Sequence, residues 1–177
     1  MNKSFSSTSA KQLTTNSLKY ILTGGLWIKN GHLPSQNHTI PANFFGVCVS
    51  SNEDPETDSY IIRQLETLGI NNIRLDFSYK DENSFNARFL EKLIASGFNI
   101  TLHLLPPSES AMHMADRGEQ EKWQQFLITT LNRFGQEIYQ IEIGNTINRK
   151  RWAGYSLDTF LITWKIAHQE VKSRSIK

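Results

Sequence analysis

The chain has 177 residues, of which 38% are hydrophobic and 20% are charged, so its composition is that of a globular protein with room for one domain core. Nineteen Lys and Arg side chains against 17 Asp and Glu side chains give a net charge of +2, which does not indicate a nucleic-acid partner. The single cysteine, Cys48, excludes an intrachain disulfide, and no apolar run is long enough for a membrane span.

The first 43 residues differ in character from the rest of the chain. Residues 1–19 are polar and contain no apolar core of a secretory signal, which predicts a flexible leader and a cytoplasmic location. Residues 20–43 hold an apolar stretch followed by Asn30-Gly31, a dipeptide typical of tight hairpins. We therefore expect a short β-ribbon or plug over residues 20–43.

Residues 44–177 are predicted to form four strand–helix pairs. Short apolar or alternating runs indicate the strands, and apolar residues at helical spacing follow each of them. Asp54-Pro55 supplies an N-cap and a first-turn proline for the first helix, and residues 106–118 are expected to be a loop. Repeated pairs of this kind need right-handed crossovers and a parallel sheet. The predicted strands cover residues 44–50, 72–78, 98–105 and 139–145.

Alternate residues along the predicted strands sort into an aliphatic set and a polar set. A doubly wound sheet has helices on both faces and should be aliphatic on both, so the pattern counts against it. A (β/α)₈ barrel keeps its helices outside and turns the other face toward an active site, which favours an α/β fold of four units, a half barrel. The alternative for any single polar residue is a buried salt bridge, with Arg74 paired to Asp76 or Glu142. The polar set comprises Cys48, Ser50, Arg74, Asp76, His103, Glu142 and Thr146.

The fourth predicted strand carries the most specific motif. Residues 141–148 read Ile-Glu-Ile-Gly-Asn-Thr-Ile-Asn, and Trp152 lies beyond them. This segment resembles the clan A retaining glycoside hydrolases, (β/α)₈ barrels whose fourth strand ends in Asn-Glu-Pro. Residues 73–79 are similar to the arginine-bearing second strand of that clan, and Gly46 is similar to its first strand. The resemblance covers roughly residues 44–172, the first half of such a barrel.

Two departures from the family pattern decide the expected function. The resemblance implies that the residue after Asn145 is the general acid/base, which needs a carboxyl group of raised pKa, but that residue is Thr146. The family nucleophile lies on a seventh strand that this chain does not reach. Asn145 matches the family residue that holds the sugar 2-hydroxyl. Glu142 points inward but lies too deep to be assigned as the acid.

Other chemistry is less well supported by the sequence. His103, His113 and Asp116 have no recognised metal-ligand spacing, so no metal or other cofactor is expected. Cys48 could act as a nucleophile beside His103, although a cysteine more often serves as packing. The basic residues 149–151 next to Trp152 and Tyr155 could meet phosphate or carboxylate, or form a solvated charge run, whereas the aromatic rings suit a sugar face.

The sequence therefore predicts a glycoside-hydrolase-like protein that lacks ordinary retaining glycosidase activity. The alternatives are a carbohydrate-binding or protein-interaction module, a truncated fragment of a full barrel enzyme, which the abrupt end of the chain favours, or a hydrolase using Asp76 or Glu142. A glycan is the expected ligand, and a second copy or second chain is expected to close the barrel because four strands leave two edges unpaired. The expected ligand-binding residues are Arg74, Asp76, His103, Asn145 and Trp152.

Overall fold

The computed structural model describes residues 15, 44–144, 147, 150–174 and 176, apart from the side chains of residues 82, 150 and 151. The predicted ribbon at residues 20–43 and nearly all of the predicted leader at residues 1–19 lie outside this range. Asn145 and Thr146 lie outside it as well. The architecture given below is therefore that of the predicted strand–helix region.

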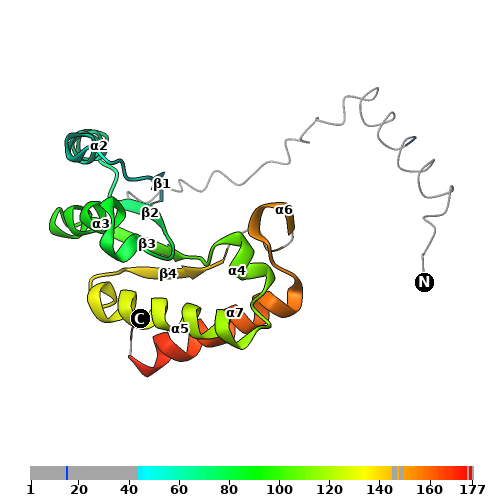
Figure 1. Cartoon of the computed structure of the whole chain (residues 1–177). Helices are drawn as coiled ribbons and strands as arrows, with labels where there is room; N and C mark the ends of the chain where they lie inside the picture. Colours follow the sequence, from blue (N-terminus) through cyan, green and yellow to red (C-terminus); the bar gives the residue numbers. More distant parts are fainter. Residues whose placement is uncertain (1–14, 16–43, 145–146, 148–149, 175, 177) are drawn as a thin grey trace, which may run out of the picture. The chain divides into compact units, whose positions relative to one another are not determined.

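Four parallel strands form one sheet in the order in which they occur along the chain (Figure 1). Their register places Cys48 beside Arg74, Asp76 beside His103, and His103 beside Glu142. The prediction of an α/β fold with four parallel strands is confirmed. The strands are β1 (Gly46–Val49), β2 (Asn72–Phe77), β3 (Asn99–Leu104) and β4 (Gln140–Ile143).

A long helix follows each strand, and three short helical segments lie between the long elements. Asp54 caps the first long helix by accepting a hydrogen bond from the backbone N–H of Glu56 at 3.0 Å, as its sequence predicts. The segment 106–118 is not only a loop, because it contains the short helix α4 and the start of α5. The helices are α2 (Pro55–Thr67), η1 (Asp81–Asn83), α3 (Phe85–Ala95), α4 (Ser108–Met112), α5 (Arg117–Phe134), α6 (Lys150–Ala153) and α7 (Leu157–Ser173).

The aliphatic face of the sheet packs against the long helices, as the alternation along the strands predicts. On this face of β2 and β3 every side chain is almost completely buried, and Trp123 of α5 lies fully buried in the same core. The indole Nε1 of Trp123 donates a hydrogen bond to the backbone oxygen of Thr163 at 3.0 Å, which joins α5 to α7. The buried strand residues are Ile73, Leu75, Phe77, Ile100, Leu102 and Leu104.

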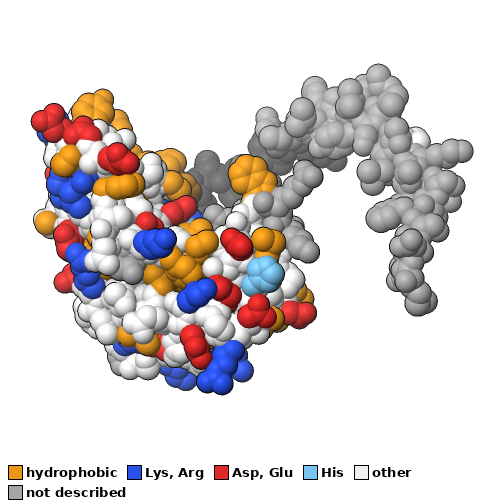
Figure 2. Space-filling model, in the orientation of Figure 1, with side chains coloured by type: hydrophobic (Ala, Val, Ile, Leu, Met, Phe, Trp, Pro, Cys, Tyr) orange, Lys and Arg blue, Asp and Glu red, His pale blue; other side chains and the backbone are white. Residues whose placement is uncertain are grey.

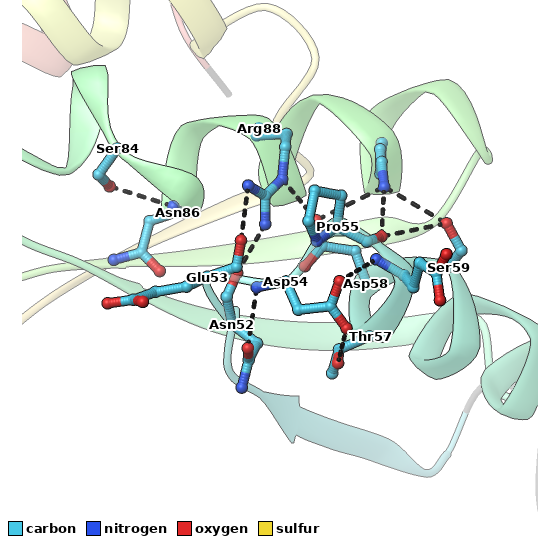
Figure 3. Close-up of polar contacts among 12 residues, drawn as sticks. Asn52, Glu53, Asp54, Pro55, Thr57, Asp58, Ser59, Ser84, Asn86 and Arg88 are labelled. Atoms are coloured by element: carbon cyan, nitrogen blue, oxygen red, sulfur yellow. Dashed lines mark hydrogen bonds and ion pairs between the residues drawn. The ribbon is translucent and has the colours of Figure 1, made fainter.

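An arginine on α3 fixes both α2 and the loop that precedes it (Figure 3). Arg88 Nε donates a hydrogen bond to Asp58 Oδ2 at 2.8 Å, and its Nη2 and Nη1 donate to the backbone oxygens of Asn52 at 2.6 Å and Glu53 at 3.2 Å. Asp58 is 0% exposed, so this contact compensates a charge that would otherwise be costly to bury. The loop after β1 is therefore held in one position relative to the two helices.

The described sheet ends at β1 on one side and at β4 on the other. The consecutive strand order and the helices on the aliphatic face are consistent with a half-barrel arrangement. In the described part of the chain, none of the helices combines the length and the apolar character that crossing a membrane requires.

Candidate functional site

Four residues of the predicted polar set form one hydrogen-bonded network across three strands. Arg74 Nε and Nη2 donate to the two carboxylate oxygens of Glu142 at 2.6 and 3.2 Å, and Arg74 Nη1 donates to Asp76 Oδ1 at 2.6 Å. His103 Nδ1 lies 2.8 Å from the same Asp76 oxygen. The network thus combines the predicted salt-bridge pairing of Arg74 with a carboxylate–imidazole pair formed by Asp76 and His103.

The network stabilises the charged forms of Arg74 and Glu142. The hydrogen bond from Arg74 holds the pKa of Glu142 below its ordinary value, although partial burial acts in the opposite direction. The same hydrogen bond raises the pKa of Arg74 above its ordinary value. Glu142 is therefore an ionised, positionally fixed carboxylate near neutral pH, and it is poorly suited to donate a proton.

His103 has an unusual environment. Its side chain is 1% exposed, and its Nε2 has no hydrogen-bond partner among the described residues. Because an ionised carboxylate can only accept hydrogen bonds, the contact with Asp76 assigns the proton to Nδ1. In the neutral ring Nε2 is then a buried acceptor without a donor, an arrangement that costs free energy unless a ligand or a water molecule supplies the donor.

Beside this pair lies a pocket of about 440 Å³ at the carboxyl ends of β2 and β3, bordered by the segment after β4. Trp152 borders the pocket and is 78% exposed, whereas Tyr155 is buried. Burial raises the pKa of the Tyr155 phenol, which therefore stays protonated at neutral pH. Ligands of parallel α/β sheets generally bind at this edge. The pocket is lined by Asp76, Ser78, His103, Leu105, Pro106, Pro107, Ser108, Trp152, Ala153 and Tyr155.

A glycine determines where Trp152 lies. Gly154 has a φ of +76°, a conformation that favours glycine, and a Cβ atom at this position would collide with the backbone oxygen of Ser108. Helices α4 and α6 are in contact, and both lie beyond the carboxyl end of β4 (Figure 1). The close approach of Gly154 to Ser108 therefore holds the segment bearing Trp152 against the pocket.

The structure brings together four of the five predicted ligand-binding residues. Arg74, Asp76 and His103 lie in the network, and Trp152 lies at the border of the adjoining pocket. Asn145, like the predicted acid/base position Thr146, is outside the described residues. The sequence did not predict the role of Gly154, because the backbone that it approaches is that of Ser108, which is distant in the sequence.

The other candidate sites do not assemble. His113 and Asp116 are exposed, with Nδ1 3.9 Å from Oδ2, and among the described residues no group of three or more His, Cys, Asp or Glu side chains could hold a metal ion. Cys48 is exposed and pairs in register with Arg74, whereas the imidazole of His103 bonds to Asp76. The geometry therefore gives no support to a cysteine–histidine pair.

Charged side chains of both signs alternate over the described part of the face shown in Figure 2, without a continuous region of one sign. The side chains of Lys150 and Arg151, and all of residue 149, lie outside the described residues, so the predicted basic loop is not placed. No protein-family model matches the chain, and no curated protein shows significant similarity to it.

Proposed function

We propose that the pocket beside Asp76 and His103 binds a carbohydrate. The observation that carries this proposal is the exposed indole of Trp152, which borders a pocket also lined by a carboxylate–imidazole pair. A sugar ring presents an apolar C–H face and a rim of hydroxyl groups. An aromatic ring contacts the first, while Asp76 and His103 accept hydrogen bonds from the second.

The same geometry favours binding over ordinary retaining hydrolysis. Retaining hydrolysis needs a protonated carboxyl group as the acid and a second carboxylate as the nucleophile. Glu142 is bonded to Arg74 and has a lowered pKa, so it does not meet the first requirement. Thr146 stands where the resembled family has its acid, and its hydroxyl group is a poor proton donor at neutral pH. We therefore propose a glycoside-hydrolase-like protein without retaining glycosidase activity.

Glycan-array binding followed by titration calorimetry tests the binding proposal. The expected result is saccharide binding by the unmodified chain and at least a tenfold loss of affinity in Trp152→Ala. Tyr139→Ala is the matched control, because Tyr139 is also an exposed aromatic residue but lies just before β4, at the opposite edge of the sheet, and does not line the pocket. Equal losses in the two variants, or no saccharide binding by the unmodified chain, would contradict the proposal.

The catalytic part of the proposal is tested with aryl glycosides. No turnover is expected for the unmodified chain or for Thr146→Glu, because the second variant restores one carboxyl group without supplying a nucleophile. Turnover by the unmodified chain that is lost in Asp76→Asn would instead show that Asp76 acts as an acid or a base.

We also propose that the four strand–helix pairs are half of a (β/α)₈ barrel closed by a second copy. Each copy offers one β1 edge and one β4 edge with parallel strands, so a twofold axis can join both pairs of edges. Helix α7 also exposes Leu157, Leu161 and Trp164 at helical spacing. Size-exclusion chromatography with light scattering should give a dimer that dissociates in Leu161→Glu, and a monomer would contradict the proposal. A cytoplasmic location stays a prediction.

A further inference from the structure

A second pocket adjoins the first at the carboxyl edge of the sheet. It has a volume of about 500 Å³ and is lined by Cys48 of β1, by Ser50 and Ser51 after that strand, and by Asn86 at the start of α3. The two pockets share Asp76, Ser78 and Leu105 in their linings. They are therefore neighbouring parts of one groove, which runs past the ends of β1, β2 and β3 to the segment after β4.

The walls of the second pocket are fixed by contacts outside it. The loop that follows Ser51 is held by Arg88, whose guanidinium binds the backbone oxygens of Asn52 and Glu53 (Figure 3). Ser84 Oγ accepts a hydrogen bond from the backbone N–H of Asn86 at 3.1 Å and so fixes the first turn of α3. A binding surface whose walls are already held in place loses less conformational entropy when a ligand binds.

The chemistry of the second pocket matches that of the first. Ser50, Ser51 and Asn86 offer hydroxyl and amide groups, and Phe85 adds part of an aromatic ring. Between the pockets lies Asp76, 60% exposed at its side chain and already aligned by Arg74 and His103. Hydroxyl-bearing units can thus be recognised at both ends and at the centre of the groove.

We propose that the groove binds an extended oligosaccharide, with one end against Trp152, a middle unit at Asp76 and the other end in the Ser50–Asn86 pocket. This inference rests on the proposed carbohydrate binding and adds the length and the course of the ligand. The groove consists of two pockets that share a centre at Asp76, so a single sugar unit can occupy only part of it.

Calorimetry with saccharides of one, two, four and six units tests the inference. Suitable probes are β-1,4-linked glucose, xylose and N-acetylglucosamine series and an α-1,4-linked glucose series. For the series that binds, affinity should rise at least tenfold from one unit to four. Affinity that is equal for one and four units would overturn the extended ligand while leaving carbohydrate binding intact, whereas failure of every series to bind would overturn both.

Two perturbations locate the far end of the ligand. Ser50→Trp should fill the second pocket and lower the affinity for the four-unit probe to that for the two-unit probe, whereas Gln136→Trp, exposed at the opposite edge of the sheet, should leave both unchanged. Alkylation of folded protein at Cys48 with N-ethylmaleimide should act as Ser50→Trp does, and Cys48→Ala should be insensitive to the reagent. Unchanged four-unit affinity after both perturbations would overturn the proposed course.

Discussion

Arg74 on β2 and Glu142 on β4 are joined across the intervening strand by two hydrogen bonds, Nε to Oε2 at 2.6 Å and Nη2 to Oε1 at 3.2 Å. A guanidinium and a carboxylate in this paired arrangement form one of the stronger and more directional polar contacts in proteins. The third guanidinium nitrogen, Nη1, donates to Asp76. Asp76 is therefore held in a defined orientation by an arginine that Glu142 fixes from β4.

The first prediction concerns the pH dependence of this ion pair. The pKa of Glu142 is lower in the folded protein than in the unfolded chain, so the pair stabilises the fold above the ordinary glutamate pKa and stops doing so as the pH falls through the lowered value. Glu142→Gln should reduce the free energy of unfolding at pH 7 by about 1 kcal/mol, a modest figure because the carboxylate is partly exposed.

Urea denaturation from pH 7 down to pH 3 measures this effect. The difference between the unmodified chain and Glu142→Gln should shrink progressively as the pH falls below the ordinary glutamate pKa, and it should vanish below the lowered pKa of the folded state, where both variants lack the charge. Glu121→Gln is the control, since Glu121 contacts Arg117 at 2.9 Å in an exposed pair on α5. A difference that stays constant over this pH range would show that the ion pair is not its source.

The second prediction concerns Arg88. Arg88→Ala removes the closest partner of the fully buried Asp58 carboxylate and leaves Lys92 Nζ at 3.6 Å. An incompletely compensated buried charge is costly, so the free energy of unfolding should fall by about 3 kcal/mol. Chemical denaturation measures the change, and Arg117→Ala, which removes an exposed arginine, should leave the midpoint nearly unchanged. Comparable effects of the two variants would contradict the buried contact.

The third prediction concerns the glycine beneath Trp152. Gly154→Ala places an alanine in a left-handed backbone conformation and brings its Cβ atom against the backbone of Ser108. The substitution should therefore lower the free energy of unfolding by about 2 kcal/mol and weaken saccharide binding. Gly118→Ala is the control, because an added Cβ atom on α5 would meet nothing within 4 Å. That variant should be neutral or slightly stabilising. Unchanged binding in Gly154→Ala would show that the close approach does not position the indole.

The strands and their two faces could be predicted because a period of two residues is visible within six residues of sequence. Ile73, Leu75 and Phe77 alternate with Arg74 and Asp76, and the structure buries the first set and joins the second into the network. The helix N-cap at Asp54 depends on a contact with a residue two positions later, so it too is visible locally.

Features that depend on contacts distant in sequence could not be predicted. Asp58 and Arg88 are 30 residues apart and lie on helices, where charged residues are usually exposed, so neither signals a buried pair. Helices α4 and α6 have five and four residues, which is too short for a helical periodicity to be recognised. The groove arises only when the segments after β1, β2, β3 and β4 meet at one edge of the sheet.

The last prediction separates the contribution of His103 to the stability of the fold from its contribution to saccharide binding. The imidazole of His103 is buried, and its Nε2 has no hydrogen-bond partner among the described residues. His103→Leu puts an apolar side chain of similar volume in its place. The loss of an unsatisfied buried acceptor should raise or preserve the free energy of unfolding, within about 1 kcal/mol, because the exposed Asp76 carboxylate can be solvated instead. If Nε2 accepts a hydroxyl group of the saccharide, the same substitution should lower affinity at least tenfold. Thr101→Val, on the same strand and the same face, should leave affinity unchanged. A variant that binds normally would place His103 outside the binding site, whereas a strongly destabilised one would show that its bond to Asp76 serves the fold.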